Sequence, residues 1–262
     1  MSFVFRVGSI NLNSSNSTVN KYLLKDFLAT NEIDILFLQE LCYDNFAFIS
    51  SHTAIVNLSE GGSGTGILIR NTFDFSQPLL ETNGRISSVI VNSVNYINIY
   101  AHSGTNKRRE RDQLFLDNMA VHLNIAGACY NVAGGDFNCI LHAIDSAGSN
   151  KNYSTGLKRL VELLKWKDIG LELKKNVYTF SRGPSESRLD RFYAPSTFLE
   201  NVSDFATIPV AFSDHSAIVM KIRSCDQCYV SCGRGYWKVN SSIMNDITVC
   251  EKLNANIGVW KT

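Results

Sequence analysis

Short apolar runs of strand length recur along the first 223 residues, and they are the feature that most constrains the fold. Residues 33–38 form a nearly continuous run, which is typical of a strand buried on both faces. Near the N-terminus, Phe3, Phe5 and Val7 alternate with other residues at the period of two that a strand requires. Further predicted strands cover residues 65–70, 85–91, 96–101, 130–133, 189–193, 202–208 and 217–222.

Three segments instead show the spacing of amphipathic helices. The first begins at a cap on Ser17 or Thr18 and breaks at Asn31, and the others cover residues 108–125 and 154–166. A Gly-rich stretch at residues 61–64 lacks the Gly-Lys-Ser/Thr of a phosphate-binding loop, so it predicts a hairpin turn. Many strands with few helices predict an α/β fold, in which two mixed sheets form a two-layered β-sandwich flanked by helices.

Composition excludes several classes of protein. Hydrophobic residues at 45% and charged residues at 19% describe a globular chain and exclude collagenous and disordered ones. No apolar run reaches membrane-spanning length, so we expect no membrane partner. A net charge of +1 argues against coating nucleic acid by bulk charge but permits a local basic face. Seven cysteines and no apolar leader predict a reducing, intracellular setting.

The apolar pattern stops near Arg223, so we expect two parts: a domain over residues 1–223 and an appendage or linker over residues 224–262. The appendage carries four of the seven cysteines. They are Cys225, Cys228, Cys232 and Cys250. A structural zinc site needs four ligands, and only the distant Cys250 could complete the set. Free thiols are therefore expected ahead of zinc.

Polar residues stand where several apolar runs end. They are Asn11, Glu40, Tyr100, Asp136, Asn138, Asp190, Asp214 and His215. Ligands of open α/β sheets bind at strand ends, so these side chains could converge on one site. Their carboxylate and amide oxygens suit Mg²⁺ or Mn²⁺ rather than zinc, which prefers cysteine and histidine.

A divalent ion beside a histidine and extra carboxylates is suited to phosphoester hydrolysis. The histidine needs a carboxylate partner, and adjacent side chains on an extended chain point apart. Asp190 is therefore a better partner for His215 than Asp214, which is left for the metal side. Asn138 can fix the phosphate, and Asp136 can position water or protonate the leaving oxygen.

Each residue alone also has an ordinary explanation. Glu40 could be a solvated loop residue and Tyr100 a core residue, while residues 136–138 could form a turn and residues 213–215 a loop cap. The functional interpretation depends on their occurring together, in order, at the ends of buried runs.

This ordered set resembles the endonuclease/exonuclease/phosphatase superfamily over residues 1–223. Within it, the sequence is most similar to the endonuclease domain of LINE-type non-LTR retrotransposon polyproteins. The segment 235–240 resembles the stretch that follows the nuclease, ahead of the reverse transcriptase. The motifs that carry the resemblance are Ile10-Asn11-Leu12-Asn13, Asn98-Ile99-Tyr100-Ala101, Gly134-Gly135-Asp136-Phe137-Asn138-Cys139, Tyr178-Thr179-Phe180 and Ser187-Arg188-Leu189-Asp190-Arg191-Phe192-Tyr193.

The resemblance implies a role for each matched residue. Glu40 would coordinate Mg²⁺, with Asn11 and Asp214 close to the ion, and Asp190 and His215 would form a charge pair at the scissile phosphate. Asp136 and Asn138 would position the nucleophile and the phosphate, and Tyr100 would hydrogen-bond the phosphate. Thr179 and Ser213 would support the site. The implied reaction nicks one strand of double-stranded DNA in the nucleus. The 3′-hydroxyl would then prime a reverse transcriptase in the same polyprotein.

Basic residues near the predicted site are candidates for binding DNA. They are Lys107, Arg108, Arg109 and Arg111, beside the loop after Tyr100, and Arg182, Arg188 and Arg191, around Asp190. The segment 180–187 is expected as a loop that could enter a groove. Alternatives are an abasic-site repair endonuclease, another phosphodiesterase of the superfamily, and a DNA-binding module without activity. The last is disfavoured because every predicted catalytic position is intact.

Overall fold

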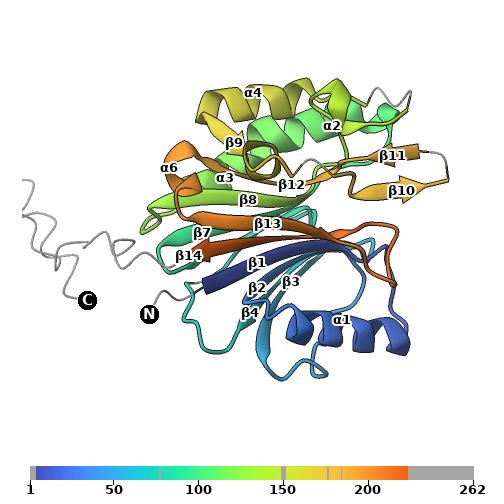
Figure 1. Ribbon diagram of the computed structural model, residues 1–262, viewed down its shortest axis with the longest axis vertical. Helices are drawn as coiled ribbons and strands as arrows, with labels where there is room; N and C mark the ends of the chain where they lie inside the picture. Colours follow the sequence, from blue (N-terminus) through green and yellow to red (C-terminus); the bar gives the residue numbers. More distant parts are fainter. Residues whose placement is uncertain (1–3, 77, 149–151, 176, 184, 224–262) are drawn as a thin grey trace, which may run out of the picture. The chain divides into compact units, whose positions relative to one another are not determined.

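Two six-stranded sheets pack face to face in the computed structural model, which describes residues 4–76, 78–148, 152–175, 177–183 and 185–223 (Figure 1). The predicted appendage with its four cysteines lies outside the described residues. In order, the first sheet holds β13 (Val202–Ile208), β14 (Ala217–Arg223), β1 (Val4–Asn11), β2 (Ile35–Leu41), β4 (Gly64–Arg70) and β3 (His52–Leu58). The second holds β5 (Leu79–Leu80), β6 (Ile86–Val91), β7 (Val94–Tyr100), β8 (Tyr130–Asp136), β12 (Asp190–Pro195) and β9 (Trp166–Asp168).

Helices cover the outer faces of the two sheets (Figure 1). On the first sheet lies α1 (Thr18–Thr30), capped by Ser17, whose hydroxyl accepts from the Asn20 amide. The elements over the second sheet are α2 (Arg108–Gln113), the π-helical turn η2 (Leu114–Asn118), α3 (Met119–Leu123) and α4 (Thr155–Leu164). The other short elements are the 3-10 turns η1 (Thr105–Lys107) and η3 (Ala143–Asp145) and the helices α5 (Ile169–Glu172) and α6 (Ser196–Leu199). Ile169 of α5 and Phe198 of α6 belong to the core between the sheets. The predicted α/β sandwich with flanking helices is confirmed.

Aromatic and branched side chains fill the space between the sheets. The rings of Phe37 from β2 and Phe192 from β12 lie 5.8 Å apart, centroid to centroid. Gly134 makes room for this pair, since a Cβ there would stand 2.3 Å from the Phe192 ring. Because the interior is this tightly packed, the two sheets hold a fixed relative position at the ends that carry the polar residues.

Several short elements escaped prediction. Strands β3, β5 and β9 lie at sheet edges or are only two or three residues long, so their apolar alternation is weak. The segment predicted as a loop over residues 180–187 contains a separate hairpin of β10 (Phe180–Arg182) and β11 (Ser185–Ser187). Its residues are mostly exposed and polar, which removes the hydrophobic signal of a strand. In α1, Leu24 is buried and Tyr22 is exposed.

The topology brings the polar strand ends to one edge of the sandwich. The parallel strands β1 and β2 end together, with Asn11 opposite Gln39, and the parallel strands β7 and β8 end with Tyr100 opposite Asp136. The antiparallel strand β12 begins at the same edge, where Asp190 pairs with Asp136. Among the described residues, no helix is both long and apolar enough to cross a bilayer.

Candidate active site

A network of amide and carboxylate groups joins the two sheets at this edge. The Asn11 amide nitrogen donates to Glu40 Oε1 at 3.2 Å and to Asp136 Oδ2 at 3.0 Å. Asn138 donates to Asp136 twice, from its backbone nitrogen to Oδ1 at 2.8 Å and from its side-chain nitrogen to Oδ2 at 2.9 Å. Asp136 is almost fully buried and held by three donors, so its carboxylate has one fixed orientation.

The backbone is strained at the same positions. Glu40 and Asn138 both adopt a φ of 49°, in the left-handed region that a side chain other than glycine rarely occupies. Gly135 has a φ of 132°, and a Cβ there would lie 2.0 Å from the carbonyl oxygen of Ile99. Strained conformations of this kind cluster at functional sites, where the surrounding structure holds them in place.

Asp190 and His215 form a buried pair. The His215 Nδ1 lies 2.8 Å from Asp190 Oδ2, and the two side chains are 7% and 0% exposed. The Thr179 hydroxyl oxygen accepts from the backbone nitrogens of Leu189 and Asp190, both at 3.0 Å, which fixes the start of β12. Within the described chain, the second oxygen of Asp190 has no hydrogen-bond partner. The sequence-based choice of Asp190 over Asp214 as the partner agrees with this contact.

Ser213 connects this pair to the first sheet. Its hydroxyl donates to the Asn11 carbonyl oxygen at 2.7 Å and accepts from the His215 backbone nitrogen at 3.0 Å. The Phe180 ring lies 4.9 Å from the His215 ring, centroid to centroid, and shields one side of it. Ser213 and Thr179 therefore both hold backbone next to the pair, as expected for supporting residues.

Burial and neighbouring charges set the protonation of the site. Burial raises the pKa of Asp136 to about 6, with Asp190 adding to the effect and the cationic His215 opposing it. Burial by itself would lower the pKa of His215, but the charge of Asp190 and its hydrogen bond raise that pKa to about 10. His215 therefore carries a proton at neutral pH and is suited to donate to an anion.

This protonation makes a prediction for folding. A histidine whose pKa rises from about 6.5 to about 10 on folding stabilises the protein fully below pH 6.5, and the contribution disappears as pH approaches 10. The His215→Gln variant should therefore melt well below the wild type at pH 6 and approach it at pH 10. Thermal melts in EDTA across this range test the prediction, and a gap independent of pH would contradict it.

Tyr100 closes β7 beside this network. Arg85 stands over its ring, with the guanidinium carbon 4.3 Å from the ring centroid. Burial, reinforced by the charge of Glu40, raises the pKa of Tyr100 to about 12. Its hydroxyl therefore keeps its proton at neutral pH and can donate to a phosphate oxygen.

The network and the pair open on one cleft of about 360 Å³. Glu40, Asn138, Asp214 and His215 all line it, so residues from three separate segments of the chain converge there. Arg182 from β10 and residues 103–105, which precede the basic helix α2, form other parts of its wall. A cleft with carboxylates, a cationic histidine and amide donors is suited to a phosphoester near a hydrated cation.

Comparison with known proteins agrees with this chemistry. The model of the endonuclease/exonuclease/phosphatase family matches residues 8–215. The chain belongs to this family. The match covers every predicted catalytic position, from Asn11 to His215, and it makes the chain a member of a family of phosphoester hydrolases.

Solved structures of low sequence identity share the fold. An AP endonuclease from Leishmania major matches with a TM-score of 0.71 and 18% identity, over 85% of this chain and 88% of that one. A 3′ phosphatase from Neisseria, bound to a product DNA hairpin, matches with 0.70 and 18%, over 83% and 99%. The endonuclease domain of TRAS1, a telomere-specific non-LTR retrotransposon, matches with 0.63 and 17%, over 83% and 98%.

Members of this family generally use divalent metal ions, and the donor set here fits Mg²⁺. The described residues contain no cluster of three acidic, histidine or cysteine side chains that would form an all-protein cage. Glu40 and Asp214 do place two carboxylates in one cleft. Mg²⁺ usually keeps several waters and binds through one or two carboxylates plus substrate phosphate, which matches this arrangement.

The sequence predicted that Asn11 lies close to the metal ion, but in the structure its side chain contacts two carboxylates. Its side-chain nitrogen faces the carboxylates of Glu40 and Asp136, and its side-chain oxygen Oδ1 accepts from the Asn13 backbone nitrogen at 2.8 Å. In this orientation Asn11 holds the two carboxylates in place. Ligation of the metal by its oxygen remains a prediction.

Three of the seven predicted DNA-binding cations need correction, because they are buried. Arg111 is fully buried and donates to the carbonyl oxygens of His102 and Gly104 and to Asn152. Arg188 and Arg191 are 3% and 0% exposed and pair with internal carboxylates. A guanidinium held this way cannot reach a phosphate on the surface. The exposed candidates are Lys107, Arg108, Arg109 and Arg182.

A second polar network near the site was missed by sequence reasoning. Gln39 donates to Asn98 Oδ1 at 2.7 Å and to the Ser9 hydroxyl at 3.0 Å, and all three side chains are buried. Asn98 in turn donates to the carbonyl oxygens of Leu38 and Gly66 in the opposite sheet. The signal was an amide within the otherwise apolar run 97–99, which folding alone does not require.

Proposed function

We propose that this chain is a Mg²⁺-dependent endonuclease that nicks one strand of double-stranded DNA. The observation that carries the proposal is the convergence of two arrangements on one cleft. One is the network of Asn11, Glu40, Asp136 and Asn138, and the other is the Asp190–His215 pair. Together they offer a place for a cation, an acceptor for a water proton and a cationic donor for the phosphate.

The residues divide the reaction among them. Glu40 and Asp214 would hold the ion, which neutralises charge on the phosphate when it is bound. Asp136 accepts a proton from the attacking water, a role that its raised pKa of about 6 supports. The water oxygen forms a bond to phosphorus while the bond to the 3′ oxygen breaks, and that oxygen takes up a proton from solvent water, leaving 3′-hydroxyl and 5′-phosphate ends. His215 and Tyr100 donate hydrogen bonds to the phosphate oxygens. Asn138 holds Asp136 in place, because its side-chain nitrogen donates to Asp136 Oδ2 and to the Ala101 carbonyl oxygen, both at 2.9 Å.

The biological setting we propose is a non-LTR retrotransposon. The sequence motifs around the site and the segment 235–240 support it, and the fold similarity to the TRAS1 endonuclease domain is consistent with it. In this setting the new 3′-hydroxyl primes reverse transcription in the nucleus. The reverse transcriptase follows in the same polyprotein.

A supercoiled plasmid tests the activity directly. With Mg²⁺, the wild type should convert it to open circle, and Asp136→Ala should not. Asp26→Ala removes an exposed carboxylate from α1 and should nick like the wild type. Resealing by DNA ligase should show 3′-hydroxyl and 5′-phosphate ends. Equal nicking by Asp136→Ala, or none by the wild type, would refute the proposal, and far faster cutting of an abasic duplex would favour the repair function.

Arg182 is expected to contribute to DNA binding. It is exposed on β10 and lines the cleft beside His215, where a backbone phosphate can reach it. Arg182→Gln should weaken binding to all DNA sequences alike and reduce the slope of log affinity against log salt by about 1. Arg159→Gln, an exposed arginine on α4, is the matched control. The same salt slope in Arg182→Gln and the wild type would exclude this contact.

A further inference from the structure

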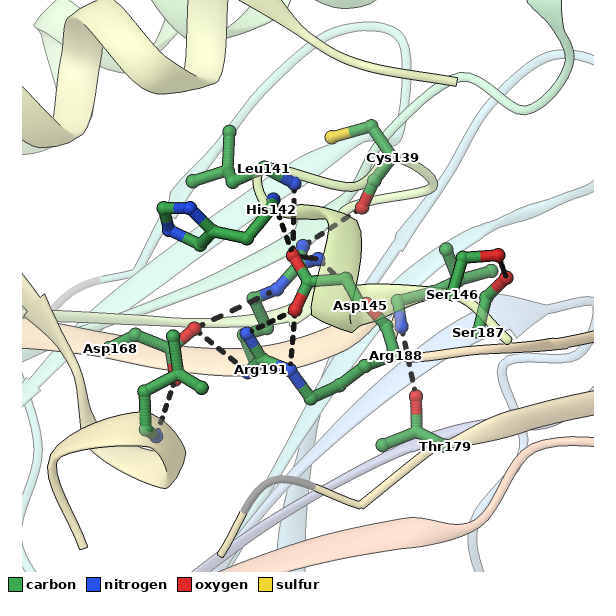
Figure 2. A network of polar contacts seen from close by, with 12 residues as sticks. Cys139, Leu141, His142, Asp145, Ser146, Asp168, Thr179, Ser187, Arg188 and Arg191 are labelled. Carbon is green, nitrogen blue, oxygen red and sulfur yellow. Dashed lines mark hydrogen bonds and ion pairs between the residues drawn. The ribbon is translucent and has the colours of Figure 1, made fainter. Parts of the chain in front are cut away.

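Four charged side chains, here called the ion cluster, lie beside the strand that carries Asp190, three of them buried and the fourth, Asp168, 9% exposed (Figure 2). They are Asp145, Asp168, Arg188 and Arg191. Arg188 donates to Asp145 at 2.7 Å and to Asp168 at 2.8 Å, and Arg191 lies 3.2 Å from Asp145. Two acids and two arginines balance in charge. The proposed chemistry uses none of them.

Asp145 also holds the segment that follows Asn138. Its Oδ2 accepts from the backbone nitrogens of Leu141 and His142, both at 3.0 Å (Figure 2). Arg191, itself paired with Asp145, donates to the carbonyl oxygen of Cys139 at 2.9 Å. The loop that leaves the Asp136–Asn138 segment is therefore fixed by the same carboxylate.

The cluster holds the start of β12 as well. Arg188 and Arg191 lie on either side of Asp190 in sequence, and the Arg188 backbone nitrogen donates to the Asp145 carbonyl oxygen at 2.8 Å. Neighbouring side chains of a strand point to opposite faces, so anchoring Arg191 in the cluster leaves Asp190 facing His215. A slip of one residue would exchange the two faces.

We propose that Asp145 is a positioning residue for the reaction. It fixes the Asp136–Asn138 segment and the Asp190 strand relative to each other. Buried ion pairs contribute little net stability compared with apolar packing, and their best-attested use is to specify one arrangement. A displacement of about 1 Å in catalytic groups can slow a reaction by about 10²-fold. Holding Asp190 in a fixed orientation therefore has a large effect on the rate. The inference rests on the proposed nuclease function.

The test compares Asp145→Asn, Asp190→Asn and the double variant in single-turnover nicking. Asp145→Asn should lower the rate by about 10²-fold and leave DNA affinity within about 2-fold of the wild type. In the Asp190→Asn background it should slow nicking by less than about 3-fold, because the group it positions is already disabled. The proposal would be overturned if the rate loss of the double variant equalled the product of the two single-variant losses. A folded Asp145→Asn protein that nicks at the wild-type rate would also overturn it.

Two further variants separate positioning from folding. Asp168→Asn removes one negative charge from the same cluster, but Asp168 makes no contact with the backbone of Leu141 and His142. Its loss of nicking rate should therefore be smaller than that of Asp145→Asn by a factor of about 10 or more. If Asp145→Asn does not fold, Arg188→Lys replaces it in the test, because lysine keeps the positive charge but cannot make the two hydrogen bonds of Arg188 to Asp145. The same double-variant comparison with Asp190→Asn then tests the positioning role. A wild type that leaves DNA intact refutes the nuclease function alone, and the cycle is then measured on bis(p-nitrophenyl) phosphate.

Discussion

Replacing His215 with alanine is expected to slow nicking of a supercoiled plasmid by about 10²–10³-fold, the usual loss when one preorganised hydrogen-bond donor to the transition state is removed. His215 carries its proton at neutral pH because the buried Asp190 lies 2.8 Å away and raises its pKa to about 10. Alanine removes this cation from a cleft where negative charge develops in the transition state. Single-turnover rates with enzyme in excess over plasmid give the measurement.

The Asp190 partner provides the control for this prediction. If the pair acts as a unit, Asp190→Ala and the double variant should both nick about as slowly as His215→Ala, because removing either member disables the other. DNA binding should change little in any of the three. Full multiplication of the two losses would show that the residues act separately, and wild-type nicking by His215→Ala would remove it from the mechanism.

Glu40→Ala is expected to reduce nicking by about 10²-fold or more at low Mg²⁺, since the ion contributes several kcal/mol to charge stabilisation. Glu40 lines the cleft with Asp214 and accepts from the Asn11 amide, so it is the best-positioned metal ligand in the described chain. Raising the Mg²⁺ concentration should recover part of the rate, because Asp214 and the substrate phosphate remain.

A matched substitution separates this effect from a change in surface charge. Glu162→Ala removes an exposed glutamate from α4, where its side chain is 66% exposed, and should leave the Mg²⁺ dependence of nicking unchanged. EDTA should abolish nicking by every variant. A Glu40→Ala protein with wild-type rate and wild-type Mg²⁺ dependence would exclude Glu40 as a ligand.

Much of the fold followed from local sequence patterns. The buried run at residues 33–38 predicted β2, and the cap at Ser17 with the break at Asn31 predicted α1 almost to its ends. Strands β3, β5 and β9 and the β10–β11 hairpin could not be found this way. Edge and outlying strands bury little apolar surface, so their sequences carry no strong period of two.

The sequence by itself determined the catalytic candidates and their order, because polar residues at the ends of buried runs need a reason other than packing. Only the tertiary structure decided which charges face the cleft. Arg188, Arg191 and Arg182 are all arginines near Asp190 in sequence, yet two are buried with Asp145 and one is exposed. Whether an arginine reaches solvent depends on carboxylates distant in sequence that offset the cost of its burial, and folding brings these together.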